Sequence, residues 1–140
     1  MSHRTVHVTE HQGLARMITV GPHRLIVDEP APLGGDMGPD PIEVLLAALG
    51  ACTSMTVRMY ADRHAWALRD VQVRLRLEQG GEPAVIREIF LDGDLTDDQR
   101  SRLMAVAGRC PVHRLLSAPP PITTVPIEHT ALAAHDAGNS

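Results

Sequence analysis

The sequence predicts an α+β fold, with β-sheets wrapped around a central apolar helix. Three observations lead to this prediction. The chain has 140 residues, 44% of them hydrophobic, which is enough for a single domain whose core needs no metal or disulfide. Strand patterns and helix patterns follow one another along the chain instead of alternating regularly. The longest helix pattern is more apolar than one small sheet can cover, so we expect a homodimer that buries these helices together.

The N-terminal third of the chain predicts three short strands followed by a loop. The β-prone stretches are Thr5–Glu10, Ala15–Val20 and Arg24–Asp28, and the Gly21-Pro22 pair between the second and third is typical of a hairpin turn. Pro30–Pro41 contains four prolines and three glycines, which indicates a shaped loop.

The next segment predicts a long buried helix that ends near Arg63. Asp40 suits the N-cap position and Pro41 the first turn. Apolar side chains then recur at helical spacing. Gly50 lies in the middle of this pattern, and we expect it to mark either a break or a close contact with another helix. The residues at helical spacing are Leu45, Leu46, Leu49, Cys52, Met55, Thr56, Met59 and Tyr60.

Two strands and a capped helix follow. The stretch from Val71 to Glu78 alternates apolar and polar residues, as a strand with one buried face does. Gly80-Gly81 turns the chain into a second strand, Ala84–Asp92. Thr96-Asp97-Asp98-Gln99 is a capping-box pattern that opens a helix. This helix is expected to end near Gly108–Cys110, and its core-facing residues are Leu103, Val106 and Ala107.

The C-terminal part predicts less regular structure. Val112–Ser117 suits one or two further helical turns, and Pro119–Pro121 is stiff, extended chain. Thr123–Ile127 has the composition of a last strand. His129–Ser140 is small and polar, so we expect a frayed tail beyond a core of about residues 4–128.

Composition excludes several function classes. All 13 basic residues are arginine, so Schiff-base chemistry on lysine is excluded. A net charge of −4 and three scattered aromatic residues argue against nucleic acid as a partner. The most apolar run, Val44–Cys52, is too short to span a bilayer, and the first fifteen residues lack a signal-peptide pattern, so we expect a cytoplasmic protein that does not bind membranes. No cofactor-binding motif such as G-x-G-x-x-G is present.

The two cysteines are either inert core residues or redox-active ones. Cys52 lies within the apolar helix pattern, where a buried thiol keeps its proton. Cys110 lies at a helix end beside two arginines and a histidine, and positive charge there favours a thiolate. Cys110 and His113 also have the spacing of metal ligands, but the other histidines complete no ligand set, so no metal is expected.

The residues around both cysteines resemble the OsmC/Ohr family, named for osmotically inducible protein C and organic hydroperoxide resistance protein. The similarity covers about Val8–Ile127, and it is strongest in the branch with a Cys-Pro-Val-His-Arg motif. The matching segments are Asp28-Glu29-Pro30, Gly34-Gly35-Asp36, Gly38–Pro41, Glu43–Thr53, Met59–Arg63, Gly93-Asp94-Leu95 and Cys110–Leu116.

The resemblance implies an intertwined α+β homodimer that reduces organic hydroperoxides. Cys52 matches the peroxidatic cysteine of the family, which becomes a sulfenic acid. Cys110 matches the resolving cysteine, which forms a disulfide with it. A dithiol such as dihydrolipoamide then reduces this disulfide.

Two further site residues follow from the resemblance, and both depart from its pattern. The family has a glutamate directly after the proline of the long helix, where this chain has Ile42, so Glu43 is the nearest candidate. On an unbroken helix Glu43 would lie about 13.5 Å from Cys52 along the axis and on the opposite face. The family also has an N-terminal arginine that holds the thiolate, for which Arg16 is the first candidate and Arg24 the alternative.

The sequence leaves two functions open. The first is a cysteine-based peroxidase that uses Cys52, Cys110, Arg16 and Glu43. The second is a dimer of the same fold without peroxidase turnover, which senses redox state or binds a small molecule. Ile42 at the glutamate position motivates the second.

Overall fold

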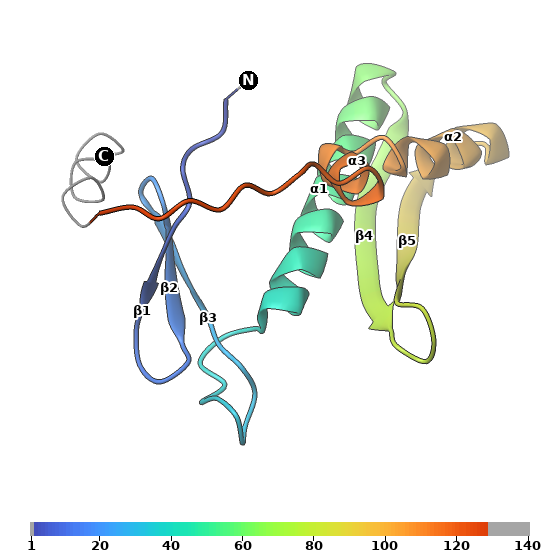
Figure 1. Cartoon of the computed structure of the whole chain (residues 1–140). Helices are drawn as coiled ribbons and strands as arrows, with labels where there is room; N and C mark the ends of the chain where they lie inside the picture. The colour runs from blue at the N-terminus through green and yellow to red at the C-terminus, as the bar shows by residue number, and fades with distance from the viewer. Residues whose placement is uncertain (1, 129–140) are drawn as a thin grey trace. The chain divides into compact units, whose positions relative to one another are not determined.

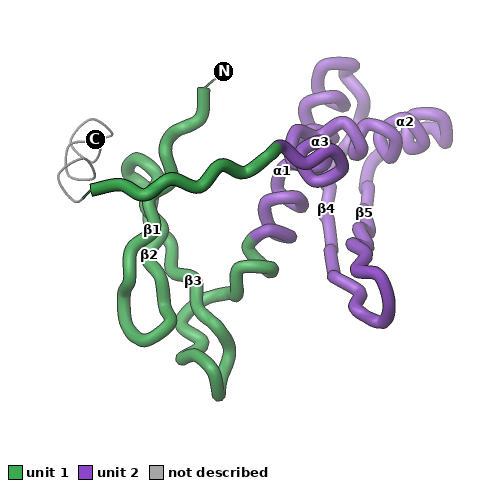
Figure 2. Tube along the Cα trace, in the orientation of Figure 1, with its two compact units in different colours: residues 1–44, 121–140 green, residues 45–120 purple. Residues whose placement is uncertain are grey.

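The computed structural model describes residues 2–128, and in this range it contains five strands and three helices (Figure 1). The chain divides into two compact units, shown in different colours in Figure 2. Unit 1 comprises residues 1–44 and 121–140, and unit 2 comprises residues 45–120. The expected α+β class is confirmed by the mixture of antiparallel strands and helices. The single domain with a core of about residues 4–128 stays a prediction, and the expected frayed tail lies outside the described residues.

Unit 1 contains an antiparallel three-stranded sheet in the order β1-β2-β3, which the sequence predicted. The strands are β1 (His7–Glu10), β2 (Arg16–Val20) and β3 (His23–Val27). Val20 pairs with His23, so Gly21-Pro22 is the two-residue turn between them. Gly21 has a φ of 56°, a conformation that glycine adopts without strain.

The loop after β3 is ordered around the buried carboxylate of Asp28. Its oxygens accept hydrogen bonds from the backbone N–H groups of Glu29 at 2.8 Å, Met37 at 3.1 Å and Gly35 at 3.2 Å. These donors, Met37 first, hold the pKa of Asp28 below its ordinary value. A side chain at Gly34 would overlap the carbonyl oxygen of Glu29, so the close approach requires glycine. The shaped loop expected at Pro30–Pro41 is confirmed.

The long helix α1 (Pro41–Arg63) is continuous, so Gly50 does not break it. A Cβ at Gly50 would lie 2.6 Å from Cδ1 of Leu75, which belongs to a strand. The close contact predicted at Gly50 therefore exists, but its partner is a strand and not a second helix. The missing side chain lets the helix backbone approach the sheet.

Unit 2 packs α1 and a second helix against a two-stranded antiparallel sheet. The strands are β4 (Ala67–Glu78) and β5 (Ala84–Asp94), and the helices that follow are α2 (Asp97–Ala107) and α3 (Pro111–Ser117). Thr96 closes the predicted capping box with Gln99, and α2 ends at Gly108. The core of unit 2 consists of Val57, Ala61, Leu68, Leu103 and Ala107.

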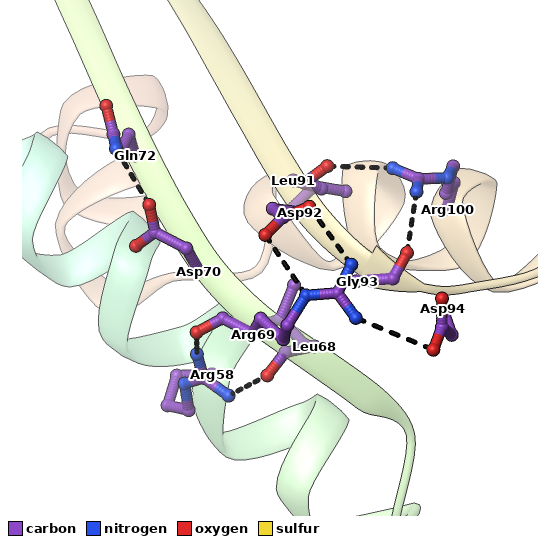
Figure 3. A network of polar contacts seen from close by, with 10 residues as sticks. All are labelled: Arg58, Leu68, Arg69, Asp70, Gln72, Leu91, Asp92, Gly93, Asp94 and Arg100. Atoms are coloured by element: carbon purple, nitrogen blue, oxygen red, sulfur yellow. Dashed lines mark hydrogen bonds and ion pairs between the residues drawn. The ribbon is translucent and has the colours of Figure 1, made fainter.

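Strand β4 begins earlier than its alternation predicted, because a β-bulge lies between Leu68 and Asp70. Figure 3 shows how arginine satisfies the carbonyl groups there. Arg58 of α1 donates to the carbonyl oxygens of Leu68 at 2.7 Å and Arg69 at 3.2 Å. Arg100 of α2 donates in the same way to the carbonyl oxygens of β5 residues Leu91 and Gly93. Two guanidinium groups thus join the helices of unit 2 to its sheet.

The prediction of a strand at Thr123–Ile127 is wrong, because this segment has no regular secondary structure. Its side chains are exposed, and no described strand pairs with it. Pro126 also lacks the N–H that a sheet ladder needs. The β-prone composition was correct locally, but a strand requires a partner that the described part of this chain does not provide.

The long helix predicted to be buried is only partly buried within a single chain. Only Leu49, Gly50, Thr53, Val57 and Ala61 are buried. Leu45, Met55 and Met59 are 43%, 63% and 54% exposed. By length and composition alone, α1 is long and apolar enough to cross a membrane. The shorter run Val44–Cys52 did not predict this. An apolar helix face of this size calls for a covering partner.

Candidate functional site

The two cysteines lie side by side in unit 2 as free thiols. Cys52 comes from the middle of α1, and Cys110 comes from the turn between α2 and α3. Cys110 is close enough to Cys52 to raise the pKa of the Cys52 thiol. The fold therefore brings near each other two thiols that are far apart in the sequence, and proximity is the first requirement for a disulfide.

Cys110 is fully buried and serves as the N-cap of α3. Its sulfur accepts a hydrogen bond from the backbone N–H of His113 at 3.2 Å. Pro111 follows at the first position of the helix, where its missing N–H costs nothing. The Cys-Pro-Val-His sequence thus forms a helix start that fixes the thiol in one place.

Cys52 is only partly buried, so it is the more accessible of the two thiols. Burial is nevertheless the largest influence on it and raises the pKa of the Cys52 thiol above its ordinary value. Contact with Cys110 raises it further, whereas hydrogen bonds with the Val112 backbone and the Thr56 side chain lower it. The net effect disfavours the Cys52 thiolate.

A hydrogen-bonded chain connects the cysteine pair to an arginine that the sequence analysis did not single out. The Thr53 hydroxyl lies 3.9 Å from the Cys110 sulfur and donates to the Leu49 carbonyl oxygen at 2.7 Å. Arg87 of β5 donates to the same hydroxyl at 3.1 Å. Among the described residues, the Arg87 guanidinium forms no ion pair.

The strand pattern contained a signal for Arg87. In the register of β4 and β5, Arg87 is opposite Leu75, on the face that also carries Val73, Ile89 and Leu91. Residues directly opposite each other share one face of an antiparallel pair. An arginine on an otherwise apolar, inward-facing row is therefore unusual, and it could have been identified once the register was known.

A pocket of about 230 Å³ adjoins this chain in unit 2. Arg87, Leu49 and His113 line it, and each of them also contacts Thr53 or Cys110. Leu116 and Val85 add apolar walls, so the pocket combines a hydrophobic lining with one cation. This composition suits an apolar molecule that carries a polar end.

The other predicted site residues, Arg16, Arg24 and Glu43, belong to unit 1. Arg16 donates to the carbonyl oxygens of Gly13 and Ala15 and forms an ion pair with Glu10. Arg24 is exposed on β3.

Glu43 makes reciprocal hydrogen bonds with Asp40 at the start of α1. Its carboxylate accepts from the Asp40 N–H at 2.9 Å, while the Asp40 carboxylate accepts from the Glu43 N–H at 2.8 Å. These two residues therefore form a capping box, in which Glu43 stabilises the helix start. The catalytic roles predicted for Arg16 and Glu43 stay predictions.

Within residues 2–128, no three histidine, cysteine or acidic side chains are arranged to hold a metal ion. His113 contacts the Cys110 sulfur through its backbone N–H.

Comparison with known proteins identifies the family to which the sequence is similar. The profile of the family described as OsmC-like protein matches residues 34–125. The chain is also similar to the solved structure of an OsmC-like protein from Mycoplasma pneumoniae, with 14% identity, a TM-score of 0.72, and coverage of 84% of this chain and 89% of that one. No curated protein sequence matches the chain.

Two further structures belong to proteins named for hydroperoxide resistance. The first, from Legionella pneumophila, is called an organic hydroperoxide resistance protein OsmC; it is 21% identical, with a TM-score of 0.63 and coverage of 83% and 91%. The second is the organic hydroperoxide resistance protein OhrB of Bacillus subtilis, at 20% identity, a TM-score of 0.58 and coverage of 82% and 92%. At these identities the likeness establishes the fold.

Proposed function

The chain belongs to the OsmC-like protein family, and from this membership and its paired thiols we propose that it is a cysteine-based peroxidase that reduces organic hydroperoxides. The observation that carries the proposal is the proximity of a partly exposed Cys52 to a fully buried Cys110 within one compact unit. The accessible thiol of Cys52 reacts with the substrate, and the buried thiol of Cys110 reacts afterwards with the oxidised Cys52.

The proposed oxidation of the cysteine pair takes two steps. The Cys52 thiol first loses its proton to the solvent. The thiolate attacks the outer oxygen of the hydroperoxide, the O–O bond breaks, and Cys52 becomes a sulfenic acid, while the alkoxide that leaves takes up a proton from the solvent and becomes an alcohol. Cys110 then attacks the Cys52 sulfur, a disulfide forms, and the hydroxyl group leaves as water after taking up the Cys110 proton. An external dithiol such as dihydrolipoamide reduces the disulfide and restores both thiols.

The pocket lined by the hydrogen-bond partners of Thr53 and Cys110 favours an organic substrate over hydrogen peroxide. Its walls are largely aliphatic, with Leu49, Val85 and Leu116 among them. Burying the alkyl group of a hydroperoxide there is favourable, by about 25 cal/mol for each Å² removed from water. Hydrogen peroxide has no alkyl group and gains nothing from such walls.

We further propose that the working form is a homodimer in which α1 contacts its counterpart. The apolar face formed by Leu45, Met55 and Met59 is exposed in one chain, and a second copy supplies a surface of matching chemistry. The catalytic roles predicted for Arg16 and Glu43 require this dimer. The cytoplasmic location is part of the same proposal.

One observation favours the second candidate, a redox sensor or binding protein without turnover. The pKa of Cys52 is raised, mainly by burial, so the thiolate population at neutral pH is reduced. A slow thiol that reacts once suits a sensor, whereas a peroxidase needs rapid turnover.

A peroxide-consumption assay separates the two candidates. The purified protein is mixed with cumene hydroperoxide and dihydrolipoamide, and the remaining peroxide is measured. We expect the wild type to consume many equivalents of peroxide, Cys52→Ser to consume none above background, and Cys110→Ser to stop after one equivalent. Consumption of a single equivalent by the wild type would establish the sensor, and no difference from Cys52→Ser would overturn both candidates.

A further inference from the structure

We propose that Arg87 is a positioning residue for Cys110, acting through Thr53 during disulfide formation. The proposal rests on the Cys52–Cys110 chemistry of the proposed function and assigns part of it to Thr53, which follows Cys52, and to Arg87, which lies outside the matching segments. Arg87 lies on β5 and Thr53 directly follows Cys52 on α1, so the chain of contacts links strand, helix and the turn that carries Cys110.

The hydrogen-bond capacity of Thr53 fixes the direction of each contact. A threonine hydroxyl has one proton to donate and two lone pairs to accept. Its proton goes to the Leu49 carbonyl oxygen at 2.7 Å, so the guanidinium of Arg87 must be the donor at 3.1 Å. The second lone pair faces Cys110 at 3.9 Å, and in this state the thiol is the donor.

The same hydroxyl can support the Cys110 thiolate. When Cys110 loses its proton, rotation of the Thr53 O–H turns the proton from Leu49 to the sulfur. The Leu49 carbonyl oxygen tolerates this change because an α-helix already supplies the Thr53 N–H to it. Arg87 keeps donating to the oxygen throughout, which makes the hydroxyl a stronger donor to an anion.

Arg87 has no carboxylate partner among the described residues, unlike the arginines of the outward face of the sheet. Arg74, for example, is paired with Glu88 at 2.6 Å. The charge of Arg87 is therefore free to act on an anion at the cysteine pair.

The step that Arg87 supports is the attack of Cys110 on an oxidised Cys52. In the peroxidase cycle the two reactants are a Cys110 thiol and a Cys52 sulfenic acid, and the products are a disulfide and water. The same attack can be driven without peroxide by 5,5′-dithiobis(2-nitrobenzoate). This reagent converts the accessible Cys52 into a mixed disulfide and releases one thionitrobenzoate. Cys110 then displaces a second thionitrobenzoate, forming the Cys52–Cys110 disulfide and giving its proton to the solvent.

The experiment measures the two releases of thionitrobenzoate separately, at fixed pH. Because Arg87 also lines the pocket, the rate of the second release is compared with that of the first in each variant. We expect Arg87→Met to lower this ratio about tenfold, the effect of losing one hydrogen bond from a charged group. Arg87→Lys, which keeps a cationic donor, should recover most of the rate. Arg74→Met is the matched control, because it removes an exposed arginine from the same sheet, and it should change neither release.

A double-mutant cycle tests whether Thr53 transmits the effect. Thr53→Val should slow the second release as Arg87→Met does, and the double variant should be no slower than either single variant. An unchanged second release in Arg87→Met, or equal slowing by Arg87→Met and Arg87→Lys, would overturn the proposal. Because this assay contains no peroxide, it remains decisive even if the protein has no peroxidase activity.

Discussion

Gly50 and Leu75 are in direct contact across the helix–sheet interface of unit 2. A Cβ placed on Gly50 would lie 2.6 Å from Cδ1 of Leu75, closer than two carbon atoms approach. The helix thus accepts a residue that disfavours helix by about 1 kcal/mol in order to lie close to β4. This contact explains why a glycine occurs in the middle of the helix that carries Cys52.

A pair of substitutions tests this contact, because the effect of Gly50→Ala on the free energy of unfolding should change sign when Leu75 is shortened. Gly50→Ala should destabilise the wild type by about 1 kcal/mol, because overpacking of about 1–3 kcal/mol exceeds the helix-propensity gain. In a Leu75→Ala background the space is free, so the same substitution should be stabilising. Urea denaturation at one fixed protein concentration measures both effects. Destabilisation of equal size in both backgrounds would mean that Leu75 is not the obstacle.

The buried carboxylate of Asp28 should make the free energy of unfolding depend on pH in the acidic range. Backbone N–H groups, with Met37 first, lower its pKa from the ordinary 3.8. A lowered pKa in the folded state contributes stability that is present above pH 3.8 and is lost as the pH falls toward the folded-state value. Asp28→Asn should therefore be less stable than the wild type at neutral pH, and the difference should shrink as the pH falls below 3.8. Thermal unfolding at several pH values checks this, with exposed Glu82→Gln as the control.

Alkylation of Cys52 should show a raised pKa. Burial is the main cause and contact with Cys110 adds to it, so the reaction rate with iodoacetamide should reach half its maximum above the ordinary thiol value of 9.0. In Cys110→Ala the raising contact is absent, and the midpoint should move to lower pH. A midpoint well below 9.0 in the wild type would mean that the assembled protein adds a cation beside Cys52, which the proposed peroxidase would use.

Local sequence patterns predicted most elements correctly, because turns, caps and alternation depend on neighbouring residues. The Thr96 capping box and the Gly21-Pro22 turn are examples. The strand at Thr123–Ile127 failed because pairing is not a local property. Arg87 was missed for a related reason: its inward direction follows from the register with Leu75, which connects residues on different strands. The pairing of Cys52 with Cys110 came from the family resemblance alone, since no local pattern relates them.

Removal of the α2 cap should weaken unit 2 by a modest amount. The Thr96 hydroxyl accepts from the Gln99 N–H at 3.1 Å, and the Gln99 side chain accepts from the Thr96 N–H at 3.0 Å. Thr96→Ala leaves a helix N–H without its partner and should cost about 1 kcal/mol. Ser101→Ala, at an exposed position inside the same helix, is the matched control and should be neutral or slightly stabilising. Equal denaturation curves for wild type and Thr96→Ala would contradict the assigned cap.

The exposed face of α1 should control the oligomeric state. Met55 and Met59 are four residues apart and both exposed, so they lie on one side of the helix. If a second copy covers this side, Met55→Glu with Met59→Glu places two carboxylates from each chain in an apolar interface, where unpaired charge is strongly unfavourable. We expect a dimer for the wild type and a monomer for the double variant in sedimentation velocity. Met104→Glu, on the exposed side of α2, is the control and should remain dimeric. A monomeric wild type, or a double variant that stays dimeric, would show that another surface, or a partner of another kind, covers this apolar face.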